Sequence, residues 1–192
     1  MNAPSTATEL SPAPQPDVPV DRRQRQALVV GALTPLLPAH ALLWQREDTV
    51  PYECDGLTAY RELPLAVALP ETEAQLAAVL AACHRLGVPV VARGAGTGLS
   101  GGATPHALGV TLSLAKFNRI VRVDPVSRTA VVQSGVRNAA ISEAAARHGL
   151  YYAPDPSSKI ACTIGGNVAE NSGGMHCLKY GLTIHNVLRV RG

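Results

Sequence analysis

The chain has 192 residues, 46% of them hydrophobic and 16% charged, a composition typical of a globular protein with a sizeable core. Its formal net charge of +3 comes from 17 basic and 14 acidic residues, without a dense block of Lys or Arg. Because it also has only one Trp, five Tyr and one Phe, the sequence argues against a nucleic-acid-binding face and a nucleic-acid partner.

The N-terminal 62 residues are predicted to divide into a tail and a helical segment. Residues 1–20 contain five prolines and lack the apolar stretch of a signal peptide, which predicts a disordered tail. Residues 21–62 form the helical segment. Within it, the uncharged residues 26–45 are interrupted by Pro35 and Pro38, which predicts two short helices and no direct membrane span.

A parallel strand–helix–strand unit is predicted next. An apolar strand at 65–69 is followed by a helical pattern, in which Thr72 and Gln75 have the spacing of a capping box and Gly87 is the stop signal. A second strand at 88–92 completes a unit of about 30 residues, the length of a parallel crossover.

A further strand is predicted at 109–113, and after it the pattern changes to antiparallel. The alternating runs at 119–123 and 129–133 are separated by the turn sequence D-P-V-S, which predicts a hairpin. A helix at 138–148 ends at Gly149. Residues 151–159 contain two prolines and are predicted to be an extended loop, and the final L-R-V-R-G is typical of a further strand.

The first chemical signal is a glycine-rich loop at residues 92–102, A-R-G-A-G-T-G-L-S-G-G. Its G-x-G-x-x-G follows a strand and Asp124 lies about twenty residues on, as in a Rossmann turn. The residues after it break helices and lead into a strand, so no helix N-terminus is available. The loop is therefore predicted to hold a phosphate with its backbone N–H groups alone, the alternative being a flexible connection.

A second glycine cluster occupies residues 164–174, I-G-G-N-V-A-E-N-S-G-G. Gly165 and Gly166 precede what is predicted to be a single helical turn, with Gly173 and Gly174 at its exit. The start of this helix is predicted to direct its N–H groups and positive dipole end toward a ligand. Two such backbones suggest a long ligand with an anionic middle and a polar ring at one end, as in the dinucleotide FAD.

Three segments together resemble the FAD-binding domain of the vanillyl-alcohol oxidase and p-cresol methylhydroxylase (PCMH) family. They are P-V-V-A-R-G-A-G-T-G-L-S-G-G, A-P-D-P-S-S-K-I-A-C-T-I-G-G-N-V-A-E-N-S-G-G and H-C-L-K-Y-G-L-T-I-H-N-V-L. Within the family they are most similar to the D-subunit of bacterial glycolate oxidase and to D-lactate and D-2-hydroxyglutarate dehydrogenases. The resemblance implies an α+β fold, a two-lobed PCMH-type domain over residues 63–192 with a small parallel α/β lobe and an antiparallel lobe that is incomplete at its C-terminus.

The resemblance also implies where FAD would lie. The first glycine loop would wrap the pyrophosphate with Gly94, Ala95, Gly96, Thr97, Gly98 and Ser100. The flavin ring and ribityl chain would lie against Pro154, Asp155, Ser158, Gly165, Gly166, Asn167, Asn171 and Gly173. Some relatives tether the flavin through a histidine at the position of Thr97, so a non-covalent FAD is expected here. Cys162 is expected to be a packing residue rather than a second tether.

Several charged or metal-binding residue types leave alternatives open. Arg93 could face a phosphate or cap the end of its strand. Lys159 and Lys179 could stabilise negative charge near the flavin or lie at the surface. A metal cluster of His176, Cys177 and His185 is not favoured, because adjacent side chains on a regular element point apart.

The family's reaction implies an oxidoreductase that transfers a hydride from the α-carbon of a small 2-hydroxy acid, such as glycolate or D-lactate, to flavin N5. The resemblance also implies a second flavin subunit and an iron–sulfur subunit as partners. The family's base, its substrate arginine and its metal motif lie in a later substrate domain. We therefore expect no catalytic residue in this chain, and we expect the chain by itself to be inactive.

The sequence also bears on the cellular compartment, and it leaves other classes of protein open. The four cysteines form no C-x-x-C pair, which argues against a zinc knuckle or a disulfide framework and favours a cytoplasmic location. Peripheral attachment to the inner membrane through partner subunits is compatible with this. Two other classes stay open: a non-catalytic nucleotide-binding module that binds NAD, and a truncated or degenerate product.

Overall fold

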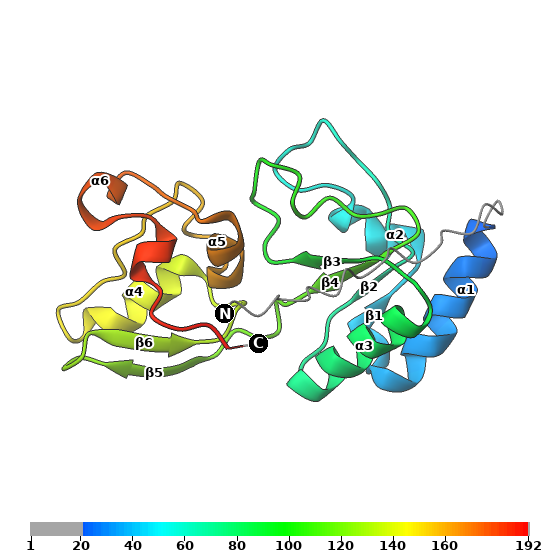
Figure 1. The fold of residues 1–192 in the computed structure, drawn as a ribbon, viewed down its shortest axis with the longest axis horizontal. Coiled ribbons are helices and arrows are strands. Elements are labelled where there is room, and N and C mark those ends of the chain that lie inside the picture. Colours follow the sequence, from blue (N-terminus) through cyan, green and yellow to red (C-terminus); the bar gives the residue numbers. More distant parts are fainter. Residues whose placement is uncertain (1–20, 192) are drawn as a thin grey trace, which may run out of the picture.

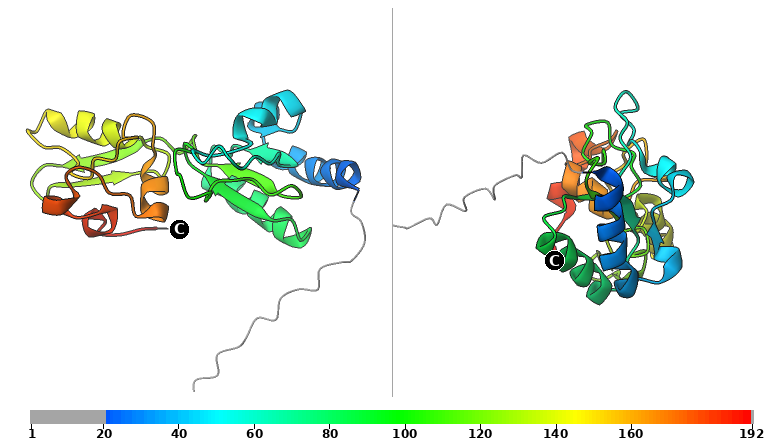
Figure 2. Two further views of the ribbon diagram at one scale, coloured as in Figure 1. Left: turned by 90° about the horizontal axis from the view of Figure 1, so that it is seen from above. Right: turned by 90° about the vertical axis from the view of Figure 1, so that its right-hand side faces the viewer.

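Two lobes, each built around its own sheet, lie side by side along the longest axis of the molecule (Figure 1). The computed structural model describes residues 21–191, so the tail predicted at 1–20 lies outside the described residues. The view from above shows the same separation of the lobes (Figure 2). The predicted α+β class is therefore confirmed, with a mainly parallel lobe followed by an antiparallel one.

The sheet of the first lobe consists of β1 (Leu42–Leu43), β2 (Ala66–Ala68), β3 (Val90–Arg93) and β4 (Val110–Ser113). Their spatial order is β1-β2-β4-β3. Both β2 and β3 run parallel to β4, whereas β1 is antiparallel to β2. The predicted parallel crossover from β2 to β3 is confirmed, with β4 between the two strands that it connects.

Helices α1 (Arg22–Leu33) and α3 (Glu73–Arg85) pack against each other and against this sheet. The helices contribute Val29, Leu33 and Val79 to the core, all with no exposed surface. Burying a side chain of this size stabilises the fold by about 1.5–3 kcal/mol. The helices therefore hold the sheet in place while the ends of its strands carry the loops of the site.

Helix α3 begins and ends where its sequence signals indicate. The Thr72 hydroxyl accepts a hydrogen bond from the Gln75 N–H at 3.2 Å, as an N-cap does. The Gln75 side chain accepts from the N–H of Glu71 at 2.8 Å, one residue earlier than in a standard capping box. Gly87, with a φ of +56°, terminates the helix in the left-handed region.

Removing the α3 cap should lower stability without touching the site. Thr72→Ala leaves the Gln75 N–H without its side-chain acceptor, so the free energy of unfolding should fall by about 1 kcal/mol. Urea denaturation followed by circular dichroism measures this change. Thr58→Ala, at an exposed loop position, is the matched control. Equal stability of the two variants would contradict the role of Thr72.

The prediction of two helices in residues 26–45 is only partly right. Helix α1 is present, but after it the chain forms two 3₁₀ turns and then β1. The turns span Thr34–Leu36 and Ala39–Ala41. Proline lacks a backbone N–H and clashes with the preceding turn, so Pro35 and Pro38 prevent a second α-helix. Among residues 21–191, no helix has the length and apolarity required to cross a membrane.

A short helix, α2 (Arg46–Thr49), and a 3₁₀ turn, Val50–Tyr52, lead from β1 into the loop at residues 53–65. This loop returns the chain to β2. It lies beside the first glycine loop, because Gly56 contacts the backbone of Gly98. The N-terminal segment thus contributes both to the sheet and to the surroundings of the site.

The second lobe contains the predicted hairpin, formed by β5 (Ile120–Asp124) and β6 (Thr129–Val132). Its turn is held by Asp124, whose carboxylate accepts the N–H groups of Val126 and Ser127 at 3.0 and 3.2 Å. This prediction is confirmed, with a register irregularity between Ile120 and Arg122.

Helix α4 (Asn138–Ala146) packs beside the hairpin and is followed by Gly149 with a φ of +66°. The predicted helix at 138–148 is therefore confirmed, two residues shorter. Its Ile141 packs with Val136 and Ile164 in a small core. The predicted extended loop at 151–159 contains no helix or strand.

Helix α5 (Ile164–Glu170) begins earlier than predicted. Thr163 is its N-cap, so Gly165 and Gly166 lie inside its first turn rather than in front of it. The helix ends at Asn171, which adopts a left-handed φ of 49°.

The remaining chain forms α6 (Cys177–Tyr180) and a 3₁₀ turn, Thr183–Asn186. The strand predicted from L-R-V-R is wrong, since residues 187–191 contain no helix or strand. A strand requires a partner for its backbone N–H and C=O groups. Within residues 21–191, no other strand pairs with this segment.

Candidate functional site

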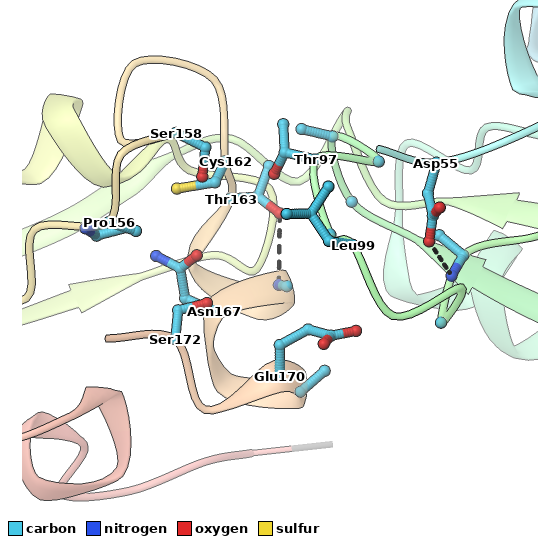
Figure 3. A pocket seen from close by; sticks show the side chains of 18 of the residues that line it. Asp55, Thr97, Leu99, Pro156, Ser158, Cys162, Thr163, Asn167, Glu170 and Ser172 are labelled. Atoms are coloured by element: carbon cyan, nitrogen blue, oxygen red, sulfur yellow. Dashed lines mark hydrogen bonds between the residues drawn. The ribbon is translucent and has the colours of Figure 1, made fainter. Parts of the chain in front are cut away.

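A cavity of about 520 Å³ lies between the first glycine loop and α5, where the two lobes meet (Figure 3). Its volume falls in the range of about 300–1,000 Å³ that small-molecule and cofactor sites occupy. Most of the predicted binding residues line it: Gly94, Ala95, Gly96, Thr97, Gly98, Ser158, Gly166, Asn167, Asn171 and Gly173.

The backbone of the first glycine loop carries unpaired hydrogen-bond donors. Within the described chain, the N–H groups of residues 95–102 donate to no protein acceptor, and the next N–H, that of Ala103, donates to Asp55. The predicted absence of a helix after this loop is confirmed. A concave run of free N–H groups is an anion-binding arrangement.

The side chains of the cavity supply no positive charge. None of the lining residues is a Lys or an Arg, and the charged ones are Asp55 and Glu170. An anion in this cavity would therefore be bound by backbone N–H groups and by hydroxyls such as those of Thr97 and Ser158. The carboxylates can accept hydrogen bonds from uncharged hydroxyl or amino groups of a ligand.

Two glycines of the first loop allow the lobes to come together. A Cβ on Gly94 would fall on the hydroxyl of Thr163, the N-cap of α5. A Cβ on Gly102 would lie 2.6 Å from Oε1 of Glu170, at the other end of the same helix. At Gly94, glycine is therefore required by the close approach between the lobes, whereas at Gly102 the flexible end of the Glu170 side chain can move away from an added Cβ.

Ser100 belongs to the same junction. Its hydroxyl donates to Oε2 of Glu170 at 2.5 Å, which joins the first glycine loop to α5 across 70 residues of sequence. Ser100 was predicted to contact the cofactor but is absent from the cavity lining. The structure gives it a bridging contact between the lobes.

The start of α5 does not present its N–H groups to the cavity, contrary to prediction. The N–H of Ile164 donates to the carbonyl of Val136, and that of Gly165 donates to Ser134, both at 2.8 Å. The N–H of Gly166 points to the Thr163 hydroxyl at 3.4 Å. The chain satisfies these donors internally, so α5 supplies packing and side chains rather than a free dipole end.

Gly165 is accordingly absent from the cavity lining. Its Cβ would lie 2.9 Å from Cβ of Ser134, so glycine permits α5 to approach that backbone. This is a packing requirement.

A buried asparagine pair fixes the loop on the opposite side of the cavity. Nδ2 of Asn167 donates to Oδ1 of Asn138 at 2.9 Å, and Nδ2 of Asn138 donates to the Pro154 carbonyl at 3.1 Å. Both asparagines are 2% exposed. Pro154 was predicted to contact the cofactor but does not line the cavity. Its carbonyl instead anchors the 153–158 loop to α4.

Asp155 also lies outside the cavity lining. Its carboxylate pairs with Lys159 at 2.8 Å, and its second oxygen is 3.9 Å from Nδ1 of His176. Lys159 is therefore engaged by a neighbour four residues away rather than directed to the cavity.

The alternatives for Arg93 are resolved toward a structural role. Its guanidinium donates to the carbonyl of Cys54 at 2.7 Å and lies 5.5 Å from the centroid of the Tyr52 ring. The side chain is 9% exposed. Arg93 thus ties the end of β3 to the loop that follows α2.

Lys179 lies 5.1 Å from the centroid of the Tyr180 ring in a small aromatic cluster. Tyr151, His176 and Tyr180 pack edge to face with centroids 6.2–6.3 Å apart. Hydrogen bonds with Tyr151 and then Lys179, followed by the Lys179 charge, lower the pKa of the Tyr180 hydroxyl. Within residues 21–191, no group of His, Cys, Asp and Glu is placed to hold a metal ion.

Cys162 is 4% exposed and lines the cavity, close to Thr163. All four cysteines are free thiols in this structure. Thr97, at the position where some relatives carry a tethering histidine, also lines the cavity (Figure 3).

The sequence interpretation missed several lining residues. These are Asp55, Ala92, Leu99, Gly102, Ala103, Pro156, Ser157, Cys162, Thr163, Ala169, Glu170, Ser172 and Gly174. Most lie within the two glycine clusters or next to them and could have been found by including every residue of these clusters and their neighbours. Asp55 lies 48 residues before its partner Ala103, so only the tertiary fold reveals it.

Comparisons with known proteins show which family the chain is similar to. Residues 64–191 match the model of the FAD binding domain. The chain is 62% identical over 162 residues to the glycolate oxidase subunit GlcD of Escherichia coli (strain K12), covering 84% of this chain and 32% of that protein. It is 36% identical over 152 residues to the D-2-hydroxyglutarate dehydrogenase of Xanthomonas citri pv. viticola, covering 79% of this chain and 32% of that one.

Among solved structures, p-cresol methylhydroxylase superposes with a TM-score of 0.69 at 21% identity, covering 78% of this chain and 30% of that chain. This similarity supports the PCMH-type fold. The chain spans about a third of the length of the curated relatives it matches. Because the family model covers most of the sequence, the chain belongs to the FAD-binding domain family that its glycine motifs predicted.

Proposed function

We propose that this chain is the FAD-binding portion of a flavin-dependent 2-hydroxy acid oxidoreductase of the glycolate oxidase or D-lactate dehydrogenase type. The observation that carries the proposal is the run of unpaired N–H groups at 95–102, which borders the cavity between the lobes. The similarity to the glycolate oxidase subunit GlcD supports the substrate class.

The residues present fit a dinucleotide. Backbone donors suit a pyrophosphate, and the absence of Lys and Arg from the lining means that these donors must supply most of its stabilisation. Asn167, Asn171 and Gly173 lie on the far side of the cavity with Ser158, where we propose that the ribityl chain and flavin ring bind. Ser100, Pro154, Asp155 and Gly165 support these segments from outside the lining.

We further propose that the FAD is bound non-covalently. Thr97 offers a hydroxyl where a tether would require an imidazole, and Cys162 is 4% exposed within the packing beside Thr163. Neither side chain has the surroundings of an activated nucleophile, because no Lys, Arg or His lines the cavity near it.

When bound, FAD would supply the acceptor for a hydride from the α-carbon of a 2-hydroxy acid at flavin N5. The residues of this chain would bind and orient it, and none is proposed as catalytic. We propose other subunits as partners, including a second flavin subunit and an iron–sulfur subunit, and a cytoplasmic or peripheral inner-membrane location.

Titration of the purified chain with FAD tests the proposal. FAD at 100 times its Kd should stabilise the folded state by about 2.7 kcal/mol and raise the Tm. An equal concentration of NAD should not. Acid precipitation should release all the flavin into the supernatant, as expected without a covalent link. Stabilisation by NAD alone would favour the nucleotide-binding module, and flavin retained in the pellet would contradict non-covalent binding.

A further inference from the structure

The loop at residues 53–58 lies against the first glycine loop at three points. At the start of the glycine loop, Arg93 donates to the carbonyl of Cys54 at 2.7 Å. In its middle, a Cβ on Gly56 would lie 2.7 Å from the carbonyl oxygen of Gly98. At its end, the N–H of Ala103 donates to Oδ2 of Asp55 at 3.4 Å (dashed in Figure 3).

The contact at Gly56 determines which way the peptide groups face. The carbonyl oxygens of Thr97 and Gly98 both approach it, with 2.7 to 3.0 Å left for a Cβ. The described chain has no cis peptide bonds, and in a trans peptide the N–H points opposite to the C=O. The N–H groups of Gly98 and Leu99 therefore point away from residue 56, and neither donates to a protein acceptor in the described chain.

Asp55 fixes the end of the same loop. It is 4% exposed, and its two carboxylate oxygens are used separately. Oδ1 accepts the N–H of Leu57 at 2.8 Å, which shapes the turn at Gly56, and Oδ2 accepts the N–H of Ala103. One buried side chain thus connects the shape of its own turn to the exit of the glycine loop.

We propose that Asp55 and Gly56 are positioning residues for the pyrophosphate cradle: Gly56 orients the peptides after Thr97 and Gly98, and Asp55 anchors the loop at Ala103. The inference rests on the proposed binding of FAD in this cavity. It assigns part of the cofactor affinity to a segment outside both glycine clusters, acting through the backbone of the loop.

The first test replaces Gly56 with alanine in the full chain. The added methyl must displace the Thr97 and Gly98 carbonyls, so the Kd for FAD and for ADP should each rise at least tenfold. ADP isolates the pyrophosphate half of the cofactor. Hydrogen exchange of the ligand-free protein should accelerate in residues 94–103. Gly31→Ala, in α1 with nothing within 4 Å of the added Cβ, is the matched control and should leave both Kd values unchanged.

Asp55→Asn tests the inference through the direction in which the Kd for ADP changes. Asparagine has one acceptor oxygen instead of two, so either Leu57 or Ala103 loses its partner. Positioning predicts a three- to tenfold rise in the Kd for ADP. If Asp55 acted only through its charge, removing a carboxylate beside an anion would lower that Kd. If Gly56→Ala does not fold, the Kd of Asp55→Asn for ADP still tests the inference.

The possible outcomes distinguish failure of this inference from failure of the proposed function. Unchanged ADP affinity and exchange in Gly56→Ala, or tighter ADP binding by Asp55→Asn, would overturn the inference while wild-type FAD binding sustains the proposed function. A lower Tm with unchanged Kd values would show that the loop at residues 53–58 affects only stability, and this result would also overturn the inference. A wild-type chain that binds neither FAD nor ADP would overturn both the proposed function and this inference.

Discussion

Replacing Gly96 with alanine should raise the Kd for FAD at least 100-fold. Gly96 has a φ of +71°, a conformation that costs an L-residue about 1–2 kcal/mol. A Cβ there would also overlap the guanidinium of Arg93. That guanidinium is buried and hydrogen-bonded to Cys54, so the loop rather than Arg93 must move, and the N–H groups that follow would lose their arrangement. Flavin fluorescence titration measures the loss.

Gly87→Ala is the control that separates the backbone strain at a positive φ from displacement of the glycine loop. Gly87 also has a positive φ, +56°, but nothing lies within 4 Å of its Cβ position. The variant should lose about 1–2 kcal/mol of stability and keep the wild-type Kd. If Gly96→Ala behaved like this control and bound FAD normally, the first glycine loop would not be the cradle.

Replacing Asn138 with alanine should lower the free energy of unfolding by about 2–3 kcal/mol and weaken FAD binding. The substitution leaves Nδ2 of Asn167 and the carbonyl of Pro154 without their partners in a buried setting. The 153–158 loop then loses its attachment to α4, on the side proposed for the flavin ring. Urea denaturation measures stability, and FAD titration at a temperature well below the Tm measures binding.

Asn186→Ala is the control for this variant. Its amide also donates to two carbonyls, those of Tyr180 and Leu182, each at 3.0 Å. Asn186 is only partly buried, so water can replace the amide and the loss should stay within about 0.5 kcal/mol. Equal losses at the two positions would show that burial of the Asn138 pair has no special importance.

Local sequence signals predicted the elements whose causes are themselves local. Thr72 caps α3, Gly87 ends it, and Asp124 closes the β5–β6 turn through hydrogen bonds within three residues. The absence of a helix after the first glycine loop was predicted for the same reason, since its breakers are adjacent in sequence. These predictions required no knowledge of tertiary structure.

The second glycine cluster shows where local reasoning failed. The pattern G-G-N-V-A-E suggests glycines in front of a helix, and the free N–H groups of its first turn suggest an anion site. In the tertiary fold, the carbonyls of Ser134 and Val136 accept hydrogen bonds from two of these N–H groups, which are therefore unavailable to a ligand. Backbone partners have no signature in the sequence, so these N–H groups were wrongly predicted to face a ligand.

The residues that hold the candidate site together were the least predictable. Ser100 and Glu170 are 70 residues apart, Asp55 and Ala103 are 48 apart, and Asn138 and Asn167 are 29 apart. Each pair depends on how the lobes and loops fold onto one another. The glycine motifs indicated where a cofactor would bind, whereas the residues that fix those motifs in space required the structure.

The unpaired N–H groups of residues 95–102 have a consequence for how such a site can be found experimentally. An alanine scan removes side chains beyond Cβ, and it leaves every backbone donor in place. A scan of the polar side chains in the lining would therefore pass over the groups that are proposed to carry the most binding energy. Backbone amide-to-ester replacement at Gly98 or Leu99 deletes the donor itself, and it would make this part of the surface visible to mutational mapping.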